Sequence, residues 1–195
     1  AALSKTLVLA LDQGSSSSRA ILFNSRGRAV FSAQRPIKTF HPKEGWIEHD
    51  ALDLALTMER ALDAVLSRAP QSARIVGAGL ACQRSTIVFW DRQTGKPAAR
   101  CPSWQDGRAA AIVAPLQGHQ AQAHDVTGLY LTPYYSAAKI RWYIDNDAQV
   151  QRLLATDRLM VGPVSSWLIW RLTEGRDFAA DPTMAQRMML FNLRS

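Results

Sequence analysis

DQGSSSSR, residues 12–19, lies between two apolar runs, 7–11 and 20–23. The apolar runs predict two strands, and the Gly and Ser residues between them predict a turn that reverses the chain. Such a turn directs backbone N–H groups and hydroxyls into one small volume, where they can bind the oxygens of a phosphate. We therefore expect the turn residues Gly14, Ser15, Ser16 and Ser17 to bind phosphate.

Asp12 lies beside this turn, at the end of the first predicted strand. Its carboxylate is a hard oxygen ligand that suits Mg²⁺ or the waters bound to it. A nucleotide phosphate held against magnesium is therefore our first hypothesis. A P-loop is excluded because the chain has no Gly-x-x-x-x-Gly-Lys and the turn leads into a strand. Serine-rich turns also join strands that bind nothing, so the motif alone leaves a plain hairpin open.

The composition describes a globular chain with an ordinary core. Of its 195 residues, 47% are hydrophobic and 20% are charged. No apolar run approaches the roughly 20 residues that span a bilayer, so we expect no membrane segment. Two cysteines are too few for a disulfide scaffold or a closed zinc site, which favours a cytoplasmic location. The net charge is +7, but the basic residues are scattered, so we expect no nucleic-acid partner.

The order of the predicted elements suggests a mixed sheet. Strands are predicted over 6–12, 19–23, 29–35 and 75–82, and a helix over 51–69 precedes the fourth of them. Three strands in a meander, followed by a helical crossover to a parallel strand, form a mixed α/β sheet with flanking helices. This is the plan of the ribonuclease H-like (actin-like) ATPase fold, in which the first hairpin turn binds phosphate. Gly77 and Gly79 predict close packing on the fourth strand.

The remainder of the chain is predicted to be mainly helical. After a strand over 86–90, helices are expected over about 106–117, 136–146, 148–155 and 164–172. No repeat, linker or low-complexity segment interrupts the chain, so residues 1–195 are expected to form one domain.

Six motifs, in order and at consistent spacing, resemble the N-terminal domain of FGGY-family carbohydrate kinases, most closely the glycerol kinases. They are LALDQGSSSSRA (9–20), GWIEHD (45–50), QRSTIV (83–88), WQDGR (104–108), TGLYLTPYYS (127–136) and SWLIWRLTEG (166–175). The resemblance implies transfer of the γ-phosphoryl group of ATP, with Mg²⁺, to a hydroxyl of a small polyol or ketose. It implies that the serine turn and Arg19 hold the phosphates and that Asp12 orients the Mg²⁺ through water. It also implies a cytoplasmic enzyme that is a homo-oligomer at full length.

Matching positions imply that five residues bind the substrate: Arg84, Ser85, Trp104, Asp106 and Tyr134. An arginine can donate twice to adjacent hydroxyls, a tryptophan ring can cover the C–H face of a polyol, and a tyrosine hydroxyl can bind a further oxygen. Without the resemblance, a surface arginine, a core tryptophan and a turn tyrosine would explain Arg84, Trp104 and Tyr134 equally well.

Two departures from the family pattern shape the expectation. Glycerol kinases carry a substrate-binding glutamate where this chain has Ser85, so we expect a preferred substrate other than glycerol. Family members are also about twice as long, and their catalytic aspartate and adenosine pocket belong to a second domain. No residue here matches the general base, so we expect this chain alone to be inactive as a kinase and to need that C-terminal domain.

Two other functions remain open. One is a non-catalytic phosphate- or polyol-binding or interaction module of the same fold. The other is an actin-like ATPase with a protein partner, against which the combination of Arg84, Trp104 and Tyr134 argues.

Overall fold

The computed structural model describes residues 6–194, and the chain folds as two compact units. The sheet unit contains the residues up to Lys38 together with Leu52–Gln83, and the helical unit contains Thr39–Ala51 and the chain from Arg84 onward. The expectation of one domain over 1–195, with a second domain outside it, stays a prediction.

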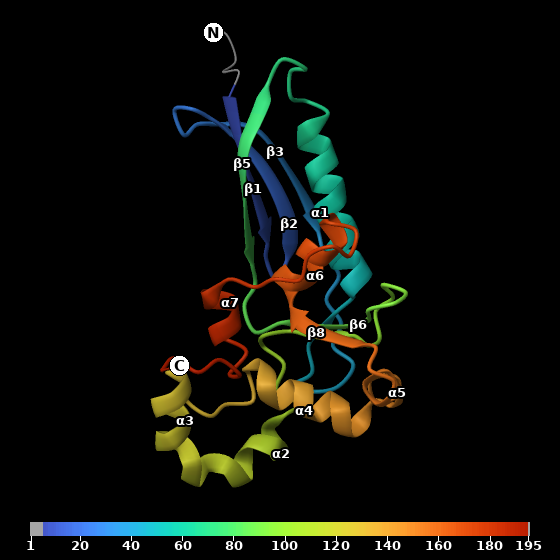
Figure 1. Ribbon diagram of the computed structural model, residues 1–195, viewed down its shortest axis with the longest axis vertical. Coiled ribbons are helices and arrows are strands. Elements are labelled where there is room, and N and C mark those ends of the chain that lie inside the picture. The colour runs from blue at the N-terminus through green and yellow to red at the C-terminus, as the bar shows by residue number, and fades with distance from the viewer. Residues whose placement is uncertain (1–5, 195) are drawn as a thin grey trace. The chain divides into compact units, whose positions relative to one another are not determined.

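The sheet unit is a four-stranded mixed sheet with one long helix (Figure 1). Its strands are β1 (Thr6–Gln13), β2 (Ser17–Asn24), β3 (Ala29–Pro36) and β5 (Arg74–Cys82), and the helix is α1 (Ala51–Leu66). The strand order is β3-β2-β1-β5, with β1 parallel to β5 and the other two pairings antiparallel. The predicted meander, crossover and mixed sheet are confirmed, although α1 ends at Leu66 instead of near residue 69.

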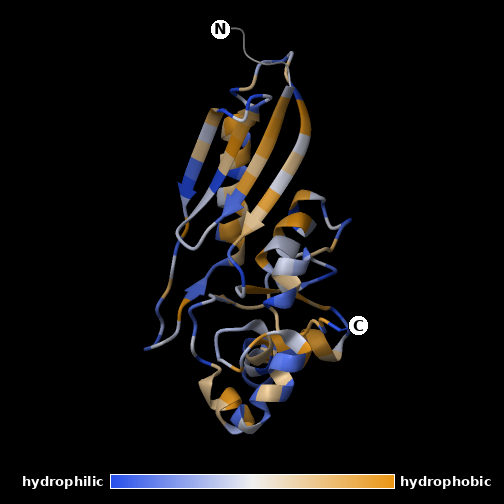
Figure 2. Cartoon of the chain, turned by 90° about the vertical axis from the view of Figure 1, so that its left-hand side faces the viewer, coloured by the Kyte–Doolittle hydropathy of each residue, from blue (hydrophilic) through white to orange (hydrophobic). Residues whose placement is uncertain are grey.

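Alternation along the strands creates the core of the sheet unit. Leu7, Leu9 and Leu11 of β1 are buried, whereas the residues between them are more exposed. Helix α1 packs on the buried face of the sheet, since the hydroxyl groups of Ser18 on β2 and Thr57 on α1 are hydrogen-bonded at 2.9 Å. Figure 2 shows hydrophobic residues along these strands and hydrophilic residues near the strand ends.

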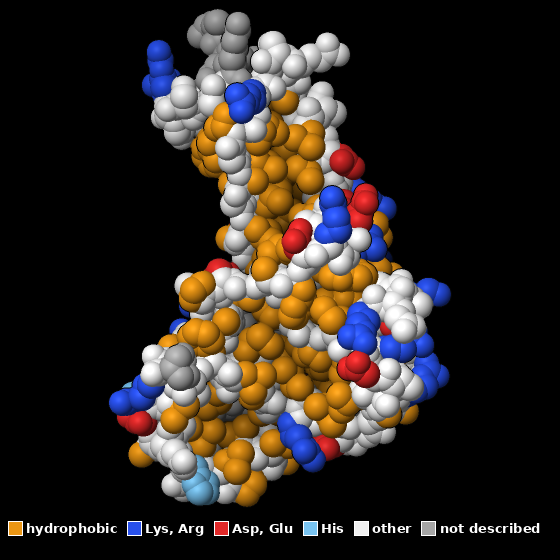
Figure 3. Space-filling model, viewed as in Figure 1, with side chains coloured by type: hydrophobic (Ala, Val, Ile, Leu, Met, Phe, Trp, Pro, Cys, Tyr) orange, Lys and Arg blue, Asp and Glu red, His pale blue; other side chains and the backbone are white. Residues whose placement is uncertain are grey.

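Strand β5 is open to solvent along most of its length. Ile75 and Val76 are exposed, as is Val8 on β1, and Figure 3 shows hydrophobic side chains gathered over β5 and α1. A Cβ added at Gly77 or Gly79 would meet nothing within 4 Å. The close packing expected at these two glycines is therefore wrong for the residues that the structure describes.

The helical unit combines two small sheets with several short helices. Strands β4 (Glu48–His49) and β7 (Cys101–Pro102) form one antiparallel pair, and β6 (Ile87–Asp91) and β8 (Leu159–Pro163) form the other. The helices are α2 (Ala110–Val113), the 3₁₀-helix η1 (Ala114–His119), α3 (Gln120–Thr127), α4 (Ser136–Asn146), α5 (Ala148–Ala155), α6 (Val164–Leu172) and α7 (Pro182–Gln186). One core cluster joins β6 to α4 and α5 through Ile87, Phe89, Tyr143 and Val150.

The three predicted helices that become α4, α5 and α6 are confirmed, but the helix expected over 106–117 is wrong. The chain becomes helical only at Ala110, and it tightens into η1 at Ala114, with a proline in the first turn. Strand β8 was not predicted, because its pairing with β6 joins residues about 70 positions apart. Within residues 6–194, no helix combines the length and the apolar character that a membrane span requires.

Candidate functional site

The turn between β1 and β2 has the geometry expected of a phosphate-binding loop. The Gly14 N–H donates to the Ser17 carbonyl at 2.9 Å and closes the turn. Ser15 and Ser16 between them are exposed. Such a turn can present several donors to one oxyanion.

Two glutamine side chains hold this turn from behind. The Gln83 side-chain amide, just after β5, donates to the Gln13 side-chain oxygen and to the Gly14 carbonyl, both at 3.1 Å. The Gln13 amide, which is fully buried, donates to the same Gly14 carbonyl at 2.7 Å. The turn is therefore fixed by neutral hydrogen bonds that leave its exposed donors available.

Asp12 and Arg19 flank the turn on one face of the sheet. They are direct cross-strand partners in the β1–β2 register, so their side chains share a face. Arg19 donates to the Gln34 side chain at 3.3 Å, and Gln34 donates to the Ser17 hydroxyl at 2.8 Å. All the residues predicted to bind phosphate thus lie on one short hairpin end.

The exposed Asp12 carboxylate suits Mg²⁺ that is also bound to phosphate. Among residues 6–194 no group of three or more His, Cys, Asp or Glu side chains could hold a metal ion by itself. Mg²⁺ in phosphoryl-transfer sites is commonly held by one or two carboxylates, several waters and the phosphates of the substrate. Asp12 fits that arrangement as a single ligand beside a turn with the geometry to bind phosphate.

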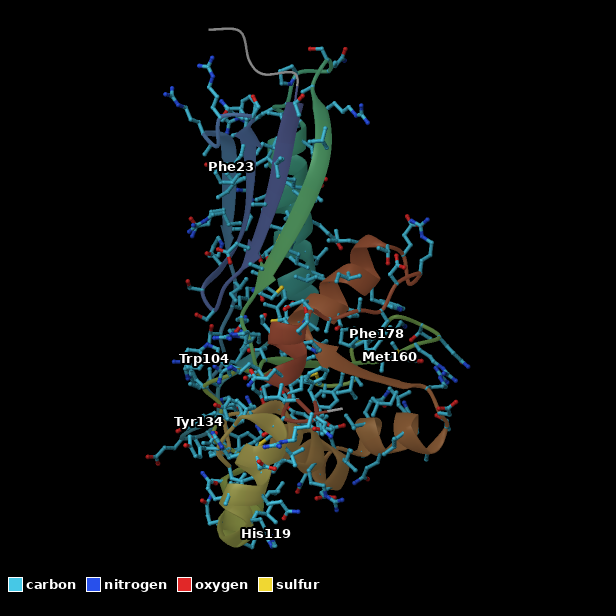
Figure 4. All side chains as sticks on the ribbon, turned by 60° about the vertical axis from the view of Figure 1, so that its left-hand side comes forward. Phe23, Trp104, His119, Tyr134, Met160 and Phe178 are labelled. Carbon is cyan, nitrogen blue, oxygen red and sulfur yellow. The ribbon has the colours of Figure 1, made fainter. Side chains whose placement is uncertain are left out.

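Three of the residues predicted to bind substrate are open to solvent in the helical unit. Arg84 is exposed, and the residues Trp104 and Tyr134 are 44% and 50% exposed. Figure 4 shows both labelled aromatic side chains at the same edge of the view. The Trp104 backbone is fixed, because its N–H donates to the Thr86 hydroxyl at 3.0 Å.

Ser85 is placed differently from these three residues. It is buried, its φ angle is 65°, and its hydroxyl donates to the Arg187 carbonyl at 3.4 Å. A residue with a Cβ rarely adopts this left-handed conformation without support from its surroundings. Ser85 therefore shapes the backbone next to Arg84, and its hydroxyl is already hydrogen-bonded within the protein.

Asp106, also predicted to bind substrate, is completely buried and fully engaged. One carboxylate oxygen accepts from the Arg108 N–H at 3.1 Å and from Arg108 Nε at 2.8 Å. The other accepts from the Ile47 N–H at 2.7 Å and from Arg108 Nη2 at 2.8 Å. We therefore infer that Asp106 stabilises the loop that carries Trp104, and we do not include it among the substrate contacts proposed below.

Arg108 is the centre of a buried ionic network that the sequence did not reveal. It also donates to Glu48 at 2.6 Å and to the Tyr143 hydroxyl at 2.9 Å, and it lies 4.1 Å from the Trp46 ring. Burial opposes its charge, but the hydrogen bonds to Asp106 and Glu48 raise the pKa of Arg108 above its ordinary value. Burial also raises the pKa of Tyr143. Glu48 lies in the GWIEHD motif and Tyr143 in no motif, and neither position indicates a partner, so only the fold could show that they meet at Arg108.

Comparisons with known proteins match nearly the whole chain to carbohydrate kinases. A profile of the FGGY family of carbohydrate kinases, N-terminal domain, matches residues 7–195. The glycerol kinase of Alcanivorax borkumensis is 40% identical over 189 residues, which are 95% of this chain and 38% of that protein. The glycerol kinase of Shewanella pealeana is 41% identical over 196 residues, covering 99% of this chain and 40% of that protein.

Solved structures show the same fold. A crystal structure of Plasmodium falciparum glycerol kinase with ADP superposes with a TM-score of 0.91 at 28% identity, covering 98% of this chain and 39% of that one. A xylulose kinase from Rhodospirillum rubrum gives 0.85 at 23% identity, covering 96% of this chain and 38% of that one. The predicted actin-like fold class is confirmed. The chain spans about two fifths of the length of these relatives.

Proposed function

The chain belongs to the FGGY family of carbohydrate kinases, and from this premise we propose that it provides the phosphate-binding and polyol-binding residues of an ATP-dependent, glycerol kinase-like sugar or polyol kinase. The observation that carries the proposal is the β1–β2 turn. Its exposed Ser15 and Ser16 lie between Asp12 and Arg19, which share one face of the sheet.

In this proposal the turn holds the phosphates of ATP. Backbone N–H groups and hydroxyls of residues 14–17 donate to phosphate oxygens, and Arg19 adds a positive charge beside them. Asp12 holds Mg²⁺ directly or through its waters. When bound, Mg²⁺ neutralises charge that develops on the phosphoryl oxygens. These residues position the phosphoryl group and stabilise its charge, which is the larger part of what a protein contributes to phosphoryl transfer.

Three residues of the helical unit bind the acceptor in this proposal. Arg84 donates to adjacent hydroxyls, the exposed face of Trp104 covers carbon-bound hydrogens, and the Tyr134 hydroxyl binds a further oxygen. Ser85 has no carboxylate to offer to the acceptor, and its hydroxyl is bound to the Arg187 carbonyl. We therefore propose that the preferred acceptor is a larger polyol or a ketose.

No residue of this chain is proposed as the general base. The group that accepts the proton of the acceptor hydroxyl belongs, in this proposal, to the C-terminal domain of the complete kinase. The purified chain is accordingly expected to release no ADP from ATP and polyol. Polyol-dependent ADP release would contradict this.

A polyol panel tests the acceptor assignment. Glycerol, xylitol and D-xylulose are titrated into ¹⁵N-labelled protein while the six tryptophan indole N–H signals are observed. We expect the Trp104 signal to move, with glycerol not the tightest ligand. Arg84→Met should weaken binding about tenfold or more, because a charge-assisted hydrogen bond is lost, whereas Arg92→Met, at another exposed arginine of the same unit, should leave affinity unchanged. Failure of all three compounds to move Trp104 would leave the non-catalytic interaction module as the better proposal.

A further inference from the structure

Lys139 on α4 is a fully buried lysine, and the mechanism above does not use it. Its side chain has a relative exposure of 0%. A lysine is almost never buried to this extent unless its ammonium group is paired. Its Nζ donates to the Ser85 carbonyl at 3.0 Å and to the Ser103 carbonyl at 2.7 Å. One buried cation therefore joins two loops that are 18 residues apart.

Both loops carry residues proposed to bind the polyol. Ser85 directly follows Arg84, and Ser103 directly precedes Trp104. A second bond between the same loops runs from the Trp104 N–H to the hydroxyl of Thr86, which is itself fully buried. The backbone next to Arg84 is thus connected to the backbone next to Trp104 by hydrogen bonds.

The hydrogen bond from Lys139 to the Ser85 carbonyl lies at a residue with an unfavourable backbone conformation. The residue has a φ angle of 65°, which is unfavourable for a residue with a Cβ. Lys139 binds its carbonyl, and its hydroxyl binds the Arg187 carbonyl. Loss of the ammonium group would remove a contact that supports this conformation, and the change would reach Arg84 through a single peptide bond.

The ammonium group is also sensitive to pH. Burial lowers the pKa of Lys139 to about 7, while the charge of Asp106 opposes the decrease and that of Arg108 adds to it. The bonds to the two carbonyls are therefore charge-assisted below neutral pH and weaker above it.

We propose that Lys139 is a positioning residue for polyol binding, and that its ammonium group fixes the placement of Arg84 relative to Trp104 through the carbonyls of Ser85 and Ser103. Lys139 does not touch the substrate in this proposal. The inference rests on the proposed function of these two loops.

The test compares Lys139→Met with Lys96→Met, a matched change at an exposed lysine of the same unit. The affinity for the tightest of glycerol, xylitol and D-xylulose is measured through the Trp104 indole signal, and folding is checked by the amide spectrum. We expect Lys139→Met to weaken binding at least tenfold and to move the Trp104 indole signal of the polyol-free protein. Lys96→Met should do neither.

Two further measurements separate positioning from a loss of folding. Wild-type affinity should fall as the pH rises from 6 to 8, and in Lys139→Met this dependence should disappear. Adding Ser85→Gly to Lys139→Met should recover part of the affinity, because glycine adopts a positive φ freely. If Lys139→Met does not fold, the wild-type pH profile decides, and an affinity that is constant from pH 6 to 8 overturns the proposal.

A folded Lys139→Met protein that binds the polyol as tightly as wild type also overturns it. If the wild-type protein binds none of the three compounds, the proposed function fails. The inference about Lys139 is then decided by the Trp104 indole signal of the polyol-free proteins, where an unchanged signal in Lys139→Met contradicts it.

Discussion

The sheet unit and the helical unit stabilise their binding residues by different means. Among the described residues of the sheet unit the buried polar side chains are all uncharged: Gln13, Ser18, Thr57 and Gln83. The helical unit buries five charged residues: Glu48, Asp91, Asp106, Arg108 and Lys139. The turn proposed to bind phosphate is therefore held by amides and by the sheet itself, whereas the loops proposed to bind the polyol are held by buried ions.

This difference predicts different sensitivities to mutation and to pH. A neutral hydrogen bond contributes about 1 kcal/mol net, but a buried charge that has lost its partner costs several times as much. All six tryptophans lie in the helical unit, so tryptophan fluorescence reports on that unit alone. The sheet unit can be followed by amide hydrogen exchange, which is resolved by residue.

The largest effect is expected at Arg108. Arg108→Met leaves the carboxylates of Asp106 and Glu48 buried without their common partner, which should destabilise the helical unit by about 3–5 kcal/mol. Urea unfolding followed by tryptophan fluorescence measures the change. Arg141→Met, which breaks an exposed pair with Asp145, is the control and should cost about 0.5 kcal/mol or less. Equal effects of the two changes would show that the buried ions do not stabilise the helical unit more than an exposed pair does.

The next effect is a dependence of stability on pH that comes from Lys139. Its pKa is about 7 in the folded protein, against an ordinary value of 10.5 for a lysine in water. Above pH 7 the unfolded chain therefore binds more protons, and the free energy of unfolding should rise with pH. The gain between pH 7 and 8.5 should be about 1–2 kcal/mol. The same fluorescence measurement in Lys139→Met should lack this gain.

Two other buried groups limit the pH range over which the free energy of unfolding rises. Burial raises the pKa of Cys101 and Tyr143, so they bind more protons when folded, and they reduce stability at more alkaline pH. A free energy of unfolding that changes equally with pH in wild type and Lys139→Met would show that Lys139 does not titrate in this range.

The smallest effect is expected in the sheet unit. Gln83→Leu removes the bonds to Gly14 and Gln13, which should cost about 1 kcal/mol and should speed amide exchange at residues 13–18. Tryptophan fluorescence should report no change in the helical unit. Gln71→Leu, at an exposed position of the same unit, is the control. Exchange rates at the turn that do not respond to Gln83→Leu would show that the glutamines do not hold it.

The two units also differ in how much of their structure could be predicted from the sequence. The strands and the crossover helix of the sheet unit were predicted because the alternation of apolar residues records which side chains are buried. In the helical unit, α4, α5 and α6 were predicted from local pattern, but the β4–β7 and β6–β8 pairs were not. Each of these pairs requires a partner more than 50 residues away.

The residues of the candidate site differ in the same way in what their sequence positions reveal. The turn residues lie together in sequence and were identified as a group. Glu48 and Lys139 were missed because their partners are distant. The spacing of Ser136, Lys139 and Tyr143 on α4 places them on one helix face, which is buried. That spacing was the available signal, but it does not identify the carbonyls that Lys139 binds.

The most direct test of the central claim is a titration of the ¹⁵N-labelled chain with Mg²⁺–ADP. The account predicts that the amide signals of residues 14–19 move, and that Arg19→Met weakens this response while the rest of the spectrum stays the same. Shifts confined to the helical unit, or no shifts at all, would contradict the assignment of the β1–β2 turn as the phosphate-binding element.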